Sequence, residues 1–265
     1  MSGEVERFYN EFAPRLVGDL VKGNPRVRRQ FELLRSAVPP GVTHVLVIGF
    51  GSGQVAHYLA QLATGARVRG VDVSSENVRI AKALFAHPRV SFEQLDVTRQ
   101  ALGGSYDLVV LPDVYEHIPV AARAVLHAEL ARSLNPNGRV ILTLPSPGHQ
   151  EALREQGHGL QVVDETVTLS DLVRLASDVG GELTYFNSIS IWKTNDYLHA
   201  VIERGAGRER PLAASDRLPI KGWAEGGRVS RAWSSFERKS GIVQLKRAWL
   251  QRSYTKRLDR NGQSA

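Results

Sequence analysis

Cysteine is absent from the 265 residues of this sequence, methionine occurs once, and no long apolar run is present. The lack of cysteine excludes disulfides, thiolate metal sites and cysteine nucleophiles. No stretch approaches the roughly 18 consecutive apolar residues that a membrane-spanning helix needs. The N-terminal segment 1–7 also lacks the basic region and apolar core of a secretory signal, so we predict a cytoplasmic protein.

Positive charge is concentrated at the C-terminal end of the chain. The formal net charge is +7, but twelve Lys and Arg against three Asp and Glu give Arg217 to Ala265 a charge of +9, which leaves −2 for the other residues. A nearly neutral body argues against nucleic-acid binding and restricts an anionic partner to the tail. Residues 231–258 predict a basic amphipathic helix suited to a membrane surface or polyanion, with a disordered tail as the alternative.

Apolar residues make up 42% of the sequence and follow an alternating strand and helix pattern. We predict strands at 45–48, 67–71, 90–93, 106–111, 139–144, 182–191 and 196–203, and helices at 54–63, 75–85, 120–133, 148–156 and 169–179. This rhythm is typical of an α/β fold with a doubly wound, mostly parallel sheet. We expect an N-terminal helical lid over 1–40, the α/β domain over 41–204, and a basic linker and tail over 205–265.

The first predicted strand runs directly into a glycine-rich loop. Gly49, Gly51 and Gly53 occupy alternate positions just before a predicted helix. Backbone without a Cβ lets a ligand approach closely, and the N–H groups at the start of a helix attract negative groups. A dinucleotide-binding loop would need glycine where the chain has Gln54, so the spacing disfavours that cofactor class. An ordinary glycine-rich turn is the alternative.

Two acidic residues follow the second and third predicted strands, and so we expect them at one edge of the sheet. Asp72 can accept hydrogen bonds from both hydroxyls of a ribose, a device that NAD enzymes share. Asp96 can accept from an adenine amino group, with Val73 and Val97 as flanking apolar contacts. A solvated loop aspartate is the alternative for Asp96.

These segments resemble the successive motifs of class I, Rossmann-like S-adenosylmethionine-dependent methyltransferases of the small-molecule or glycan type. The matching segments are Val45–Gly53, Gly70–Ser74, Leu95–Val97, Tyr106–Val110 and Leu134–Arg139. The resemblance covers roughly residues 40–145 and implies a seven-stranded sheet with an antiparallel last strand. It implies S-adenosyl-L-methionine as cofactor, and we add Asp113 and, from the lid, Tyr9 to the expected cofactor contacts.

The segment after the fourth predicted strand, Pro112–Pro119, resembles the Glu-His-hydrophobic-Pro motif of small-molecule methyltransferases. A hydroxyl acceptor must lose its proton, and histidine suits that task. We predict His117 as the general base, Glu116 as the residue that orients it or binds the acceptor, and His149 as the second candidate base. Helix packing is the alternative for His117. A divalent-metal site at Asp113, Glu116 and His117 is a weaker alternative, and we predict no metal.

The favoured function is O-methylation of a small molecule or of a sugar or glycan hydroxyl. N- or C-methylation, including RNA methylation that uses the basic tail, stays open, and so does a non-catalytic cofactor-binding module. No Asn/Asp-Pro-Pro-aromatic motif follows the fourth strand, which argues against amino-methylation of adenine or glutamine. Trp192 lies in the variable region where acceptors usually bind, with core packing as its alternative.

Overall fold

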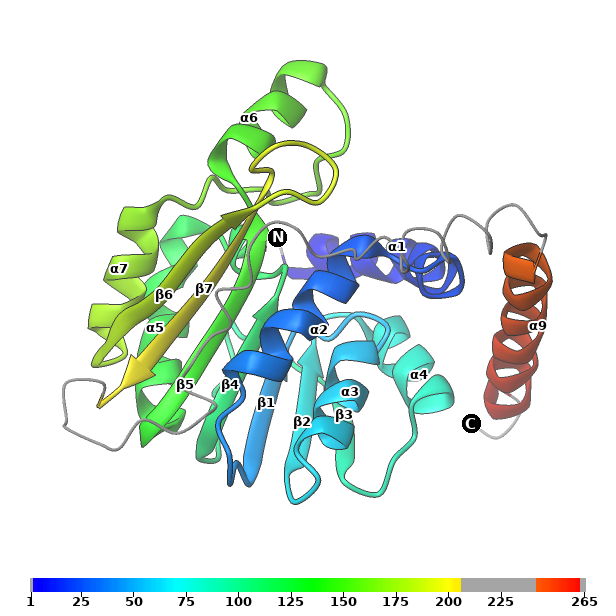
Figure 1. Cartoon of the computed structure of the whole chain (residues 1–265), viewed down its shortest axis with the longest axis horizontal. Helices are drawn as coiled ribbons and strands as arrows, with labels where there is room; N and C mark the ends of the chain where they lie inside the picture. The colour runs from blue at the N-terminus through cyan, green and yellow to red at the C-terminus, as the bar shows by residue number, and fades with distance from the viewer. Residues whose placement is uncertain (1, 206–241, 263–265) are drawn as a thin grey trace, which may run out of the picture.

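A computed structural model describes residues 2–205 and 242–262, with a seven-stranded sheet at its centre (Figure 1). The strands are β1 (His44–Ile48), β2 (Arg67–Asp72), β3 (Val90–Gln94), β4 (Tyr106–Pro112), β5 (Leu134–Pro145), β6 (Gly181–Ile189) and β7 (Tyr197–Arg204). Their order is β3-β2-β1-β4-β5-β7-β6. Strands β1 to β5 are parallel, and β7 runs antiparallel to both β5 and β6. The predicted fold class and its antiparallel last strand are confirmed.

Helices cover both faces of this sheet (Figure 1). They are α1 (Ser2–Lys22), α2 (Pro25–Ala37), α3 (Gln54–Leu62), α4 (Ser75–Leu84), α5 (Val120–Ser133), α6 (Pro147–Gln156), α7 (Leu169–Asp178) and α9 (Ile242–Gly262), with the short 3-10 helix η1 (Tyr115–His117). Among the described residues, no helix combines the length and the apolar character that crossing a membrane requires.

The two apolar layers explain why the first strand reads as an uninterrupted hydrophobic run. Val45 and Val47 pack into a cluster with α2 and α3, whereas Leu46 and Ile48 pack into a second cluster with α5 and α7. Successive side chains of a strand point to opposite faces, so a central strand covered on both faces has no polar position. This double burial fixes the register of β1 and hence the place where its glycine loop begins.

Helix α9 lies against the outer side of the N-terminal helix. Tyr254 and Leu258 pack on a small cluster that contains Ala13 and Val17 of α1 together with residues of α4. The predicted helix over 231–258 therefore corresponds to α9, which begins at Ile242; residues 231–241 and the predicted linker beyond Gly205 lie outside the described residues.

The start of β5 differs from the prediction. The sequence predicts a strand over 139–144, but the strand already begins at Leu134, which pairs with Tyr106 before the register shifts to Leu108 and Arg139. The Asn135 side chain donates to the Asp107 carboxylate at 2.6 Å, and this contact holds the irregular segment against β4. The strand thus absorbs the extra residues as a bulge.

We predict that buried His199 on β7 makes the protein sensitive to acid. Burial, with a smaller contribution from the charge of Arg29, lowers the pKa of His199 to about 4 from 6.5. The unfolded chain therefore binds more protons than the folded chain between these values, and stability falls as the pH drops through this window, by up to about 3 kcal/mol. Urea unfolding at several pH values should show that His199→Leu has a flatter dependence than the wild type.

The matched control for this measurement is His158→Leu, because His158 is exposed. An unchanged pH slope in His199→Leu would contradict the prediction, whatever the variant's stability at neutral pH.

Candidate active site

The glycine loop after β1 owes its three glycines to two different constraints. All three have positive φ: +67° at Gly49, +56° at Gly51 and +90° at Gly53. A Cβ on Gly49 would lie 2.2 Å from Val114 Cγ2, and one on Gly53 would lie 2.7 Å from a side-chain carbon of α4. A Cβ on Gly51 would meet only Leu16 of α1, at 3.4 Å. Gly49 and Gly53 are therefore required by packing within the domain, and Gly51 faces the N-terminal helix.

Asp72 at the end of β2 is bound to this loop. Its buried carboxylate accepts hydrogen bonds from the backbone N–H of Gly51 at 2.9 Å, the N–H of Ser74 at 2.9 Å and the side-chain amide of Asn77 at 3.2 Å. Burial raises the pKa of Asp72, and these hydrogen bonds oppose that shift. A carboxylate has about four acceptor positions, so three donors leave room for a further donor such as a ribose hydroxyl.

A cavity of about 300 Å³ opens beside Asp72 at the carboxyl ends of β2 and β3. It is lined by Glu6, Val73, Gln94, Asp96 and Gln100. Asp96 accepts from the N–H of Thr98 at 3.0 Å and from its hydroxyl at 2.5 Å, which fixes the orientation of the carboxylate. The structure thus brings Val73 and Asp96 together, whereas the side chain of Val97 is packed in the core.

Helix α1 is fastened over this edge of the sheet by residues that the sequence did not single out. The Asn10 side-chain oxygen accepts from the Ser74 hydroxyl at 2.6 Å and from the Glu76 N–H at 3.1 Å, so it caps the start of α4. Glu6 accepts from Gln94 at 2.8 Å. Single polar residues on an amphipathic helix carry no motif, which is why these contacts were missed.

Tyr9 of α1 lies between the Asp72 side of the site and the segment that follows β4. Its ring meets the His117 ring edge-on, with 6.3 Å between the centroids. Burial raises the pKa of Tyr9, and the nearby carboxylates of Glu116 and Asp72 raise it further. The Tyr9 hydroxyl therefore keeps its proton, and the predicted lid residue stands where both halves of the site meet.

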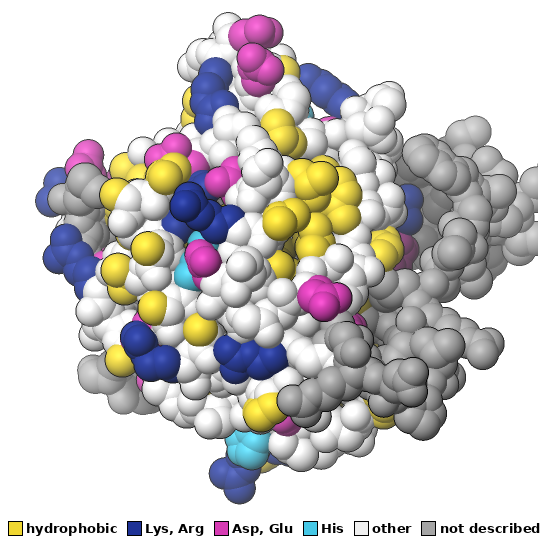
Figure 2. Space-filling view, turned by 90° about the vertical axis from the view of Figure 1, so that its left-hand side faces the viewer, with side chains coloured by type: hydrophobic (Ala, Val, Ile, Leu, Met, Phe, Trp, Pro, Cys, Tyr) yellow, Lys and Arg dark blue, Asp and Glu magenta, His cyan; other side chains and the backbone are white. Residues whose placement is uncertain are grey.

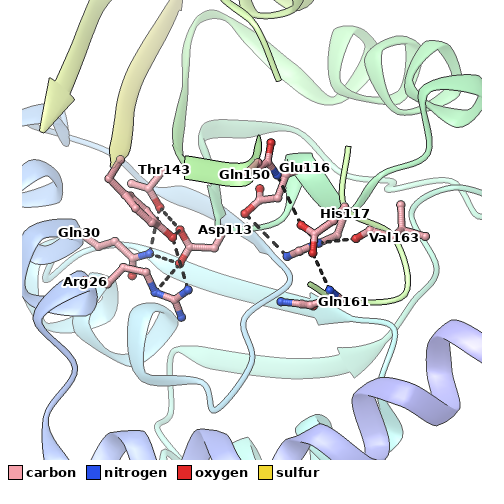
Figure 3. A network of polar contacts seen from close by, with 11 residues as sticks. Arg26, Gln30, Asp113, Glu116, His117, Thr143, Gln150, Gln161 and Val163 are labelled. Carbon is pink, nitrogen blue, oxygen red and sulfur yellow. Dashed lines mark hydrogen bonds and ion pairs between the residues drawn. The ribbon is translucent and has the colours of Figure 1, made fainter. Parts of the chain in front are cut away.

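His117 is held in one tautomer (Figure 3). Its Nδ1 lies 2.7 Å from the carbonyl oxygen of Val163, and because a carbonyl can only accept, Nδ1 carries the proton. Nε2 is then a proton acceptor, and it faces Glu116 Oε1 at 3.7 Å. Burial lowers the pKa of His117 below its ordinary value, so the imidazole is neutral at neutral pH. A neutral imidazole with a fixed tautomer has the properties of a general base.

Glu116 is a buried carboxyl group beside this histidine. It is 1% exposed, and among the described residues its Oε2 has no hydrogen-bond partner. Burial and then the charge of Asp113 raise the pKa of Glu116 well above its ordinary value. This shift favours the protonated carboxyl, which can both donate and accept a hydrogen bond.

Asp113, predicted as a cofactor contact, is engaged with other parts of the fold. Its backbone is left-handed, with φ 57°. Its carboxylate contacts four side chains: Gln30 Nε2 at 2.7 Å, Arg26 Nε at 3.0 Å, the Tyr197 hydroxyl at 2.5 Å and the Thr143 hydroxyl at 3.2 Å. These partners come from α2, β5 and β7, so Asp113 fixes the segment after β4 to three other elements. Its predicted contact with the cofactor stays a prediction.

The second candidate base, His149, and the weaker alternative of a metal site receive no geometric support. His149 lies in the first turn of α6, where its N–H donates to the Ser146 hydroxyl. No described hydrogen bond or ion pair joins it to Glu116 or His117. In residues 2–205 and 242–262, no group of His, Asp and Glu side chains is arranged to hold a metal ion. Asp113 points to α2 instead, which separates it from the other two members of the suggested metal site.

The loop between α6 and α7 contributes residues that the sequence did not reveal. The Asp164 carboxylate accepts from the Gln161 N–H at 2.6 Å, and it lies 3.5 Å from both His117 Nδ1 and Gln150 Nε2. Arg154 donates to the Asp164 carbonyl at 2.7 Å. This region has no recognisable motif, and only the fold brings it to the segment after β4.

Trp192 lies at the tip of the β6–β7 hairpin and is 53% exposed, so the core-packing alternative is wrong for this residue. The Asp196 carboxylate accepts from three backbone N–H groups of the hairpin, which makes the turn rigid. The Trp192 ring lies 6.2 Å from the ring of Tyr197, the residue bonded to Asp113. On the side of the molecule where β6 and α7 lie, hydrophobic side chains gather in an exposed patch (Figure 2).

Comparison with known proteins identifies the domain. Residues 45–138 match the family model described as a methyltransferase domain. The chain is 31% identical over 119 residues to a ubiquinone biosynthesis O-methyltransferase of Albidiferax ferrireducens, covering 43% of this chain and 46% of the relative. It is 31% identical over 129 residues to a trans-aconitate 2-methyltransferase of Azoarcus sp., covering 47% and 49%. The chain thus spans about half the length of these curated relatives.

Solved structures share the fold at low sequence identity. One such structure is a chain from the complex between the Haloferax volcanii Trm112 methyltransferase activator and its methyltransferase. It aligns with a TM-score of 0.62 and 20% identity, covering 78% of this chain and 100% of that chain. The N-methyltransferase NodS of Bradyrhizobium japonicum, in complex with S-adenosyl-L-homocysteine, aligns with a TM-score of 0.59 and 15% identity, covering 75% and 99%. At these identities the likeness shows the fold alone.

We predict that Gly49→Ala destabilises the protein more than Gly51→Ala does. Both positions have positive φ, so the backbone strain of the added methyl group is similar, but only at Gly49 does the new Cβ collide with Val114. Overpacking of this kind costs roughly 1–3 kcal/mol. Urea unfolding of both variants measures the difference in the free energy of unfolding. Equal stabilities would contradict the prediction, because they would mean that Val114 moves aside without destabilising the fold.

Proposed function

We propose that this chain is a class I S-adenosylmethionine-dependent methyltransferase that methylates a hydroxyl group of a small molecule or sugar. The observation that carries the proposal is His117, a buried and neutral imidazole whose Nδ1 proton is committed to Val163 and whose Nε2 is a proton acceptor. It lies at the same end of the sheet as the glycine loop and Asp72, where ligands of open α/β folds bind.

The residues at the first half of the site fit S-adenosylmethionine. Gly51 exposes bare backbone, Asp72 has acceptor capacity for a ribose hydroxyl, and the cavity lined by Val73 and Asp96 is placed for an adenine ring. When bound, this cofactor supplies an electrophilic methyl group on a sulfonium that leaves as a neutral thioether. Tyr9 and Leu16 of α1 would cover it from the side opposite the sheet.

The chain's own residues would then position the acceptor and remove its proton. In-line displacement gains most from alignment, which the rigid segment after β4 supplies. His117 Nε2 would take the proton of the acceptor hydroxyl as that oxygen receives the methyl group that the bound cofactor would supply. Glu116, whose Oε1 lies 3.7 Å from Nε2, would bind the acceptor.

Relatives support oxygen as the methylated atom. One of the curated relatives described above is named an O-methyltransferase, and the other is named for trans-aconitate. Neither name indicates an amine acceptor. The nearly neutral body of the chain gives no support to RNA as the acceptor.

Calorimetry tests the cofactor assignment. We expect S-adenosylmethionine and S-adenosylhomocysteine to bind and NAD not to bind. Asp72→Asn should weaken binding by about 10- to 100-fold, because it removes a charge-assisted hydrogen bond to the ribose. Binding of NAD but of neither adenosyl compound would disprove the methyltransferase proposal.

Replacing His117 tests the base. His117→Ala should lower turnover at least ~10²-fold and leave S-adenosylhomocysteine affinity nearly unchanged. Because burial lowers the pKa of His117, wild-type kcat/KM should fall only below pH 6.5, the ordinary value for histidine, as the imidazole becomes protonated. His158→Ala, at an exposed position, is the control. Unaltered turnover in His117→Ala removes it from the mechanism.

We also propose that α9 binds an anionic membrane surface. Trp249 is 67% exposed, and Arg252 and Lys256 follow it at helical spacing and are exposed as well. Leu258 and Tyr254 face α1 and α4 instead, so the helix has a packing side and a free basic side. An aromatic residue beside cations suits the lipid interface.

Vesicle sedimentation tests this surface. The wild type should bind vesicles that contain phosphatidylserine but not neutral phosphatidylcholine vesicles. Each of Trp249→Ser and Lys256→Ser should weaken binding several-fold, since a basic residue near the surface contributes about 1 kcal/mol. Equal sedimentation of all three proteins would refute the contact.

A further inference from the structure

The region around His117 contains buried polar atoms whose hydrogen-bonding capacity the described part of the protein does not use. Among the described residues, Glu116 Oε2, Gln150 Oε1 and Gln161 Oε1 are buried and have no hydrogen-bond partner. Glu116 and Gln150 are each 1% exposed. An unsatisfied buried polar group costs about 1–3 kcal/mol, so a cluster of them needs an explanation.

These groups belong to one cluster. Asp164 accepts from the Gln161 N–H at 2.6 Å, and its Oδ1 lies 3.5 Å from both Gln150 Nε2 and His117 Nδ1. Glu116 Oε1 lies 3.7 Å from the other ring nitrogen of His117. Figure 3 shows Gln150, Glu116 and Gln161 around this histidine. Glu116 therefore lies on the Nε2 side of the His117 ring, and Gln150 and Gln161 join the cluster through Asp164 on the Nδ1 side.

The chemistry of the cluster restricts what it can bind. The side-chain oxygens of Gln150 and Gln161 can only accept, so their partners must carry N–H or O–H donors. Asp164 and Asp113 add negative charge nearby, and Arg26, whose charge acts on His117, is already paired with Asp113 at 3.0 Å. A carboxylate ligand would bring a further negative charge and no donor.

We propose that Gln150 and Glu116 bind a second hydroxyl of the methyl acceptor, so that the enzyme selects neutral molecules with at least two hydroxyl groups and rejects carboxylates. The first hydroxyl meets Nε2 of His117 and the second meets the Gln150 side-chain oxygen. This inference rests on the proposed O-methyltransferase activity and assigns Gln150 a role in specificity.

Thermal unfolding of the full chain tests the site without knowledge of the acceptor. Gln150→Met keeps the shape of the side chain and removes the unsatisfied oxygen, so we expect Tm to rise by about 2–4 °C. Gln30→Met is the matched control, because Gln30 is also buried, at 3% exposed, but donates to Asp113 at 2.7 Å and to Thr143 at 2.9 Å. The control should lower Tm. A comparable decrease of Tm in Gln150→Met would overturn the inference.

Binding to protein saturated with S-adenosylhomocysteine tests the ligand class. The probes are catechol and methyl glucoside, each with adjacent hydroxyls, phenol with one, and benzoate with a carboxylate. We expect a diol to bind at least about tenfold more tightly than phenol or benzoate, a preference that Gln150→Met abolishes and His158→Ala keeps. If neither diol binds, or if benzoate binds as tightly as the diols, the inference is overturned. Failure of S-adenosylhomocysteine itself to bind instead refutes the proposed function.

Discussion

The four contacts of the Asp113 carboxylate are the constraint on which the site depends. Arg26 and Gln30 of α2, Thr143 of β5 and Tyr197 of β7 converge on this group. They hold a left-handed backbone that would otherwise be strained. The chain after β4 is thereby directed toward Gly49, and η1 follows in the one orientation that presents Glu116 and His117. One carboxylate thus couples α2 to the segment that carries Glu116 and His117.

Burial also shifts the groups of the site toward their neutral forms. It raises the pKa of Glu116 and lowers the pKa of His117, because taking an ion out of water is costly in both cases. Burial raises the pKa of Tyr9 for the same reason. The Asp164 carboxylate, 3.5 Å from His117 Nδ1, opposes the shift of the histidine.

The half of the fold that is built from local patterns could be predicted from the sequence. The apolar run of β1, the glycines that follow it and the acid at the end of β2 are consecutive signals, and the sheet topology brings them together without further information. Asp96 and Val73 line one cavity for the same reason, and their contact with an adenine ring stays a prediction. Helix and strand boundaries agreed closely, except at the bulged start of β5.

The part of the site around His117 could not be predicted, because its contacts join residues far apart in the chain. Asn10 reaches Ser74, and Asp164 reaches His117, through packing that no spacing rule describes. Asp113 shows the same limit, since its position suggested a ligand contact and its side chain turned to α2. Helix α1 faces the glycine loop at Leu16 and packs against α9 through Ala13 and Val17. Any outward movement of α1 would separate these packed surfaces, so the C-terminal helix would oppose the opening of the sheet edge at Gly51.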